Sequence, residues 1–140
     1  MRRRLVSGVG VLAVAAVLAA GCENPSTPIP TQPSPTPVTE TFSGTLTLNG
    51  ALTFPFVSAT AGPLTGTVTA LAPDPLAVIG FALGTYAGAT CTLVLTTDEA
   101  SQNATITGVV NAQGILCARV YDAKGQLTQP VTFTITVAHF

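Results

Sequence analysis

From residue 41 to residue 140, apolar and polar side chains alternate along most of the chain. Strict alternation is typical of β-strands that bury one face, because successive side chains point to opposite sides of a sheet. The clearest case is the last one, where Val131, Phe133, Ile135 and Val137 are separated by threonines. No window repeats at the helical period for long enough to predict a helix. We therefore expect an all-β domain.

The first two strands are expected to form a β-hairpin. Alternating residues 42–48 and 52–56 flank Asn49-Gly50, a pair that is typical of a tight turn between hairpin strands. Pro55 has no N–H group to donate to a central ladder. The second strand should therefore lie at the edge of a sheet or carry a bulge.

Eight short strands are expected in all. Residues 76–83 are nearly all apolar, which is typical of a strand covered on both faces, and the polar segment TTDEASQN at 96–103 predicts a loop. This pattern predicts an antiparallel eight-stranded sandwich, jelly-roll-like in topology. An immunoglobulin-like sandwich is the alternative, although the chain has no tryptophan and its cysteines fall late. The predicted strands are 42–48, 52–56, 64–70, 76–83, 91–95, 104–110, 115–121 and 131–137.

Three stretches of this domain resemble the bacterial pre-peptidase C-terminal domain. The resemblance implies a jelly-roll-like accessory module of secreted proteins, in a family often attached to peptidases, some of whose members bind collagen or calcium. No peptidase accompanies the module in these 140 residues. The three stretches are Phe42-Ser43-Gly44-Thr45-Leu46, Ala61-Gly62-Pro63-Leu64, and Tyr121-Asp122 together with Val131-Thr132-Phe133-Thr134-Ile135.

Residues 1–21 have the composition of a signal peptide. A run of three arginines precedes the uncharged and mostly apolar residues 5–20, which are short for a bilayer span of about 20 residues. The sequence LAAGC ending at Cys22 resembles a bacterial lipobox, although Ala19 stands where that pattern prefers leucine. The resemblance implies cleavage before Cys22 and lipidation of its thiol. An uncleaved anchor, or an ordinary signal peptide with an incidental Cys22, is the alternative.

Residues 22–40 are predicted to be a tether between the lipidated Cys22 and a β-sandwich domain at 41–140. This segment is rich in Pro, Thr and Ser, and repeated proline favours an extended spacer that rises about 3.1 Å per residue. A ligand for a proline-binding module or a glycosylated stalk is the alternative. Glu23, not aspartate, follows the cysteine, which favours the outer membrane in a cell with two membranes.

Cys91 and Cys117 remain as a pair in an exported domain, where oxidising conditions favour a disulfide. Two separately buried thiols are the alternative. After cleavage before Cys22, two basic residues face six acidic ones, which leaves a net charge of about -4 (2 - 6). Two basic residues are too few for the positive surface that nucleic acid requires, so nucleic acid is excluded as a partner.

Candidate chemistry is sparse. The single histidine, His139, is expected at a solvent-exposed strand end, so we predict no catalytic triad and no enzyme activity. If each strand crosses the sandwich once, Asp74, Asp98, Glu99 and Asp122 fall in loops at one end. Carboxylates are ligands that calcium prefers, so these four residues are a candidate calcium site, with solvated loops as the favoured alternative.

These observations together predict a non-catalytic module that is lipid-anchored to the bacterial envelope and binds a glycan or protein ligand. No cofactor is expected apart from the candidate calcium. A purely structural envelope lipoprotein, or an accessory module of a secreted peptidase system, is the alternative.

Overall fold

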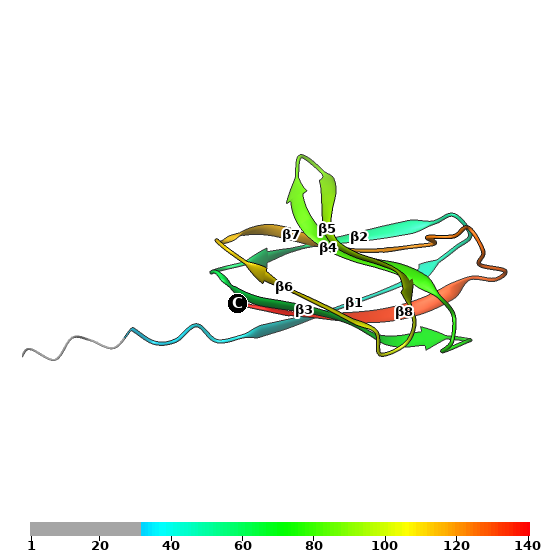
Figure 1. Ribbon diagram of the computed structural model, residues 1–140, viewed down its shortest axis with the longest axis horizontal. Coiled ribbons are helices and arrows are strands. Elements are labelled where there is room, and N and C mark those ends of the chain that lie inside the picture. The colour runs from blue at the N-terminus through cyan, green and yellow to red at the C-terminus, as the bar shows by residue number, and fades with distance from the viewer. Residues whose placement is uncertain (1–31) are drawn as a thin grey trace, which may run out of the picture. The chain divides into compact units, whose positions relative to one another are not determined.

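The computed structural model describes residues 32–140, in which two four-stranded antiparallel sheets form a sandwich (Figure 1). The prediction of an all-β, eight-stranded sandwich is confirmed. Cys22, the predicted signal peptide and most of the predicted tether lie outside the described residues. The strands are β1 (Val38–Leu46), β2 (Ala51–Ser58), β3 (Gly62–Ala72), β4 (Ile79–Ala87), β5 (Thr90–Ala100), β6 (Thr105–Val110), β7 (Gly114–Tyr121) and β8 (Val131–His139).

The order of the strands is that of a jelly roll. One sheet has the order β1-β8-β3-β6 and the other has the order β2-β7-β4-β5. β1 pairs with β8, β2 with β7, β3 with β6 and β4 with β5, and every pairing is antiparallel. The first half of the domain therefore runs against the second half as one long ribbon, which is rolled so that successive pairs fall in opposite sheets.

The predicted hairpin between the first two strands is wrong, although its turn exists. Gly50 N–H donates to the carbonyl oxygen of Thr47 at 2.8 Å, and Asn49 has a positive φ of 56°. The strands on either side, however, lie in opposite sheets. The prediction failed because alternation specifies which face of a strand is buried and not which strand is its partner. The two-residue hairpin is instead the connection of β4 to β5, where Gly88 and Ala89 both have positive φ.

β2 is an edge strand, as Pro55 predicts. Other strand limits differ from those expected. β1 begins at Val38, three residues inside the segment assigned to the tether. β5 continues to Ala100 through most of the segment predicted as a loop, because Ala100 is fully buried and Thr97 pairs with Phe81 of β4.

The core lies between the sheets and consists of the inward residues of the alternating pattern. In β8, Phe133, Ile135 and Val137 are buried, whereas the threonines between them are half-buried on the outer face. β4 is the exception to alternation, since all six of its residues from Ile79 to Gly84 are buried. The prediction of a strand covered on both faces is thus confirmed, but the strand begins at Ile79 and Leu76 is exposed.

Cys91 of β5 and Cys117 of β7 form the predicted disulfide, with their Cα atoms 5.9 Å apart. β4 lies between β5 and β7, so the disulfide crosses over one of the two inner strands of its sheet. Gly84 of β4 pairs with Cys117, and a Cβ atom at this glycine would collide with the carbonyl oxygen of Thr92. The missing side chain therefore allows β5 to approach β4 closely beside the bridge. The hairpin end of β4 and β5 projects beyond the sheets in Figure 1.

Within residues 32–140 there is no helix of the length and apolar character needed to cross a membrane.

Replacing both Cys91 and Cys117 with alanine should lower the free energy of unfolding by roughly 3 to 4 kcal/mol. The physical reason is the entropy that the unfolded chain regains when a loop of 26 residues is no longer closed. Urea unfolding of the wild-type chain, with and without reductant, and of the double variant measures the difference. A loss below about 1 kcal/mol in the double variant would contradict a structural role for the bridge.

Candidate functional site

A cavity of about 400 Å³ opens between the two sheets on the side formed by β5 and β6. We call it the apolar cavity. Its inner wall contains the buried side chains of Leu64, Leu83 and Leu116. Its rim contains three exposed aliphatic side chains, whose exposed fractions are 67% for Val94, 72% for Val109 and 53% for Ile115. Three of the exposed large hydrophobic residues of the described domain thus surround one opening.

The topology explains why a cavity forms here. β5 and β6 are edge strands of opposite sheets, so no backbone ladder joins them and only side chains can fill the gap. Three lining residues, Gly84, Gly108 and Gly114, contribute no side chain. A Cβ atom at Gly108 would meet the side chain of Leu95 at 2.5 Å, whereas one at Gly114 would meet nothing within 4 Å. Of the three glycines, only Gly114 borders open space, because the carbonyl oxygen of Thr92 and the side chain of Leu95 already occupy the space at Gly84 and Gly108.

The apolar cavity has no charged residue in its lining and no aromatic ring. Its polar side chains are those of Thr85, Asn111 and Gln113, all of them exposed. The cavity can therefore bind an uncharged apolar group by burial, with hydrogen bonds available only at its mouth.

Sequence reasoning missed this cavity, although a signal was present. Strict alternation breaks at the pairs Val109-Val110 and Ile115-Leu116, where two apolar residues are adjacent. One member of each pair must point away from the core, because neighbouring residues of a strand face opposite ways. Val109 and Ile115 are the exposed members, and both line the apolar cavity.

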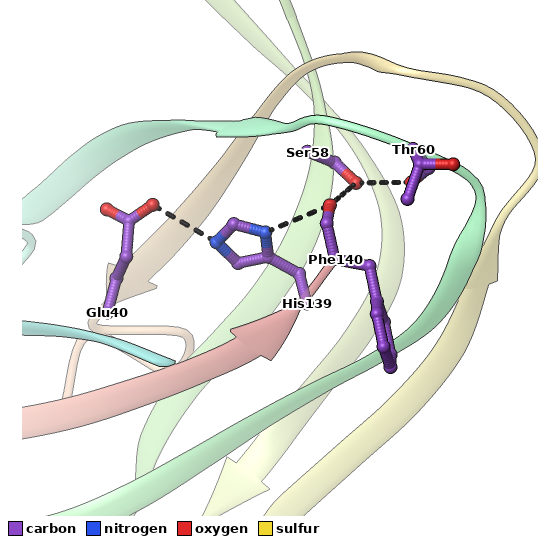
Figure 2. Close-up of polar contacts among 5 residues, drawn as sticks. All are labelled: Glu40, Ser58, Thr60, His139 and Phe140. Atoms are coloured by element: carbon purple, nitrogen blue, oxygen red, sulfur yellow. Dashed lines mark hydrogen bonds and ion pairs between the residues drawn. The ribbon is translucent and has the colours of Figure 1, made fainter. Parts of the chain in front are cut away.

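His139 is buried, with 3% of its surface exposed, so the expected solvent-exposed strand end is wrong. Its Nε2 lies 3.1 Å from Oε1 of Glu40 (Figure 2). Its ring centroid is 5.0 Å from that of Phe56. The reason is the early start of β1, since Val38 pairs with His139 across the ladder and Glu40, two residues later, contacts the imidazole. Val38 and Glu40, which composition assigned to the tether, therefore contact the end of β8.

Ser58 lies near His139 but is not directed at it (Figure 2). Its Oγ is 2.9 Å from the main-chain oxygens of both Thr60 and Phe140, and the hydroxyl donates toward these atoms. The Phe140 oxygen also lies 3.5 Å from Nδ1 of His139. A serine, a histidine and a carboxylate thus come together, but the serine hydroxyl is 99% buried and bound to main-chain oxygens. This His139 cluster connects β1, β2 and the end of β8, and it lacks the hydroxyl-to-imidazole bond of a triad.

The predicted calcium ligands are each engaged with a different partner. Oδ1 of Asp74 accepts a hydrogen bond from Leu76 N–H at 2.8 Å. Asp98 and Glu99 project from strand β5, not from the expected loop, because β5 continues to Ala100. Oδ1 of Asp98 accepts from the hydroxyl of Tyr121 at 2.6 Å, and Glu99 forms an ion pair with Lys124 at 2.9 Å.

Asp122 holds two loops together at the same end of the sandwich. Its carboxylate accepts hydrogen bonds from the N–H groups of Asn49, at 3.0 Å, and Gln126, at 3.2 Å. Asp122 and Asp74 also line a second cavity of about 280 Å³. Among residues 32–140, no three His, Cys, Asp or Glu side chains lie close enough together to hold a metal ion. Calcium binding at this end stays a prediction.

These contacts change the acidity of two groups. Partial burial, the hydrogen bond to Asp98 and the negative charge of that residue raise the pKa of Tyr121 to about 12. Burial is the largest single effect and raises the pKa of Asp122, but hydrogen bonds from four main-chain N–H groups, first those of Asn49 and Gln126, together outweigh it and hold the pKa below its ordinary value. The ionised form of Asp122 is therefore the one that stabilises the fold.

No protein-family model and no curated protein matches the chain. The resemblance to the pre-peptidase C-terminal domain stays a prediction.

Replacing Asp122 with asparagine should lower the free energy of unfolding at pH 7 by about 0.5 to 1 kcal/mol, since a neutral amide oxygen accepts hydrogen bonds less strongly than a carboxylate. The pKa of Asp122 is lower in the folded chain than its ordinary value of 3.8, which applies in the unfolded chain. The stabilisation is therefore fully present above about pH 4 and is lost as the pH falls through the folded value.

Urea unfolding of the wild-type and Asp122→Asn chains at neutral and strongly acidic pH checks this prediction. The difference between them should shrink in acid. Asp74→Asn, which removes the charge from a carboxylate with one main-chain hydrogen bond, is the matched control and should have a smaller effect at pH 7. A difference of equal size at both pH values would show that ionisation of Asp122 does not stabilise the fold.

Proposed function

We propose that this chain is an exported, non-catalytic binding module that is lipid-anchored to the bacterial envelope. The apolar cavity is the observation that supports a binding role. Its lining contains no charged residue, and exposed aliphatic side chains surround its opening. Contiguous apolar surface around a concave site is typical of ligand binding, because a soluble domain otherwise gains nothing by exposing it.

The position of the cavity agrees with display on a tether. Gly62 pairs with Val110 beside the cavity, and a Cβ atom at Gly62 would contact the ring of Phe140. Val38, where the chain enters the domain, pairs with His139 next to Phe140. The cavity therefore opens at the end of the sandwich where the predicted tether joins β1.

The His139 cluster supports a non-catalytic role. Its serine and histidine are both buried, with exposed fractions of 1% for Ser58 and 3% for His139, so a substrate has no access to either. The hydroxyl of Ser58 is bound to main-chain oxygens, and the Nε2 atom of His139 faces Glu40. These residues satisfy one another as a buried polar network, which stabilises the closure of the fold.

The predicted glycan ligand is less well supported than an apolar one. Sugar binding commonly uses an exposed aromatic ring beside several hydrogen-bonding side chains, and no ring lines the apolar cavity. A purely structural role remains the alternative function, and it predicts that the cavity stays empty.

The predicted anchor is tested by replacing Cys22 with serine in the full-length chain produced in a bacterium that lipidates its exported proteins. The wild-type chain should sediment with the membrane fraction and the variant should be released, since serine has no thiol to acylate. The Cys91→Ala/Cys117→Ala chain is the matched control for loss of a thiol and should stay with the membranes. Persistence of the Cys22→Ser variant in the membrane fraction would instead support an uncleaved anchor.

A further inference from the structure

We propose that the apolar cavity binds the hydrocarbon chain of a neutral, single-chain lipid and leaves the polar head of that lipid at the mouth. This inference rests on the proposed binding role and names its ligand class. The envelope in which the protein is proposed to reside supplies such molecules.

The chemistry of the wall selects a hydrocarbon chain. Leu64, Leu83 and Leu116 present only aliphatic groups to the cavity, and no charged side chain or aromatic ring reaches it. A charged group moved into this site would lose its hydration without gaining a partner, which is strongly unfavourable. A hydrocarbon chain loses no hydrogen bonds when it enters the cavity. Its binding removes from water both its own apolar surface and that of the cavity wall.

The shape of the site agrees with one chain. A volume of about 400 Å³ is at the lower end of the range of small-molecule sites, roughly 300 to 1,000 Å³. The space lies between edge strands of the two sheets, so strands bound it on two sides. A single flexible chain fits such a gap without separating the strands.

The mouth indicates where the head would lie and that it is neutral. Thr85, Asn111 and Gln113 line the opening and are exposed, so they can donate to and accept from hydroxyl or ester groups. No lysine or arginine is among the lining residues to pair with a carboxylate or phosphate. A neutral head, such as the glycerol of a monoacylglycerol, therefore matches the mouth better than an anionic one.

The exposed rim completes the site. Val94 and Val109 come from β5 and β6, the edge strands on the two sides of the gap, and Ile115 comes from the start of β7. Their side chains extend the apolar wall outward, where the chain segment nearest the head would contact them. Charge placed on this rim should weaken binding without disturbing the core.

The test uses the full-length chain with Cys22→Ser, so that no lipid is attached by the predicted route, purified without detergent. It is titrated with a monoacylglycerol whose acyl chain carries an environment-sensitive fluorophore, below the concentration at which the probe forms micelles. We expect saturable binding of one probe per chain. Absence of saturable binding would overturn the proposal.

Two rim variants locate the site. Val109→Glu and Ile115→Glu should each weaken probe binding at least tenfold, because each brings a charge to the path of the hydrocarbon chain. Leu48→Glu is the matched control, since Leu48 is 56% exposed and lies in the turn after β1, outside the cavity lining. It should leave the dissociation constant within twofold. Equal weakening by all three variants would show non-specific adsorption and overturn the proposal.

Three further measurements distinguish the proposed lipid from other ligands and partners of the cavity and its rim. A fatty acid of the same chain length should bind more weakly than the monoacylglycerol, and tighter binding would contradict the neutral head. Flotation with phosphatidylcholine vesicles that is lost in the rim variants, without any binding of the probe, would assign the rim to a membrane surface instead. Dimerisation in size-exclusion chromatography that the rim variants abolish, without probe binding, would assign it to a second copy.

Thermal unfolding of each variant confirms that the fold is retained, which the exposure of the substituted side chains predicts. The anchor is tested separately, by fractionation of cells that produce the Cys22→Ser chain. A chain that is released from membranes by this change but binds no probe keeps the proposed anchor and loses the proposed lipid. The two failures can therefore be told apart.

Discussion

The structure depends on the antiparallel pairing of the first half of the domain with the second half. β8 must lie between β1 and β3, and β7 between β2 and β4, before either sheet is complete. These contacts join residues far apart in the sequence, so the fold forms through long-range pairing. The His139 cluster secures the ends of this ribbon, because Glu40 of β1 and Ser58 of β2 both bind the last residues of the chain. This role explains why the His139 cluster is buried.

The same rolled ribbon leaves two open sides, where edge strands of opposite sheets face each other. On the side of β1 and β2, Phe42 and Phe54 stack with their ring centroids 5.2 Å apart and fill the gap. On the side of β5 and β6, no aromatic ring fills the gap and the apolar cavity remains. The same topology therefore gives a filled gap on one side and an open gap on the other, depending on the side chains that line each gap. The open side is where a ligand can enter without unpairing any strand.

Alternation in the sequence predicted the strands and their buried faces, because burial of one face imposes a period of two. It could not predict partners, so the turn at Asn49 was assigned to a hairpin although its strands lie in opposite sheets. Composition also gave the wrong start for the first strand and the wrong end for the fifth. Val38 follows a proline-rich segment but pairs with His139, and the polar residues Asp98 and Glu99 lie on an edge strand, where outward side chains need not be apolar. The disulfide was predictable from the number of cysteines together with the predicted export of the domain.

The gap between β5 and β6 is proposed as a binding site and not a packing defect. Methyl NMR of the Cys22→Ser chain, titrated with unlabelled monoacylglycerol, tests it most directly. The methyl signals of Leu64, Leu83 and Val109 should shift to saturation together, whereas those of Leu48 and Leu127, which lie outside the cavity lining, should not. Shifts spread over both ends of the sandwich, or none at Leu64 and Leu83, would contradict a site inside the cavity.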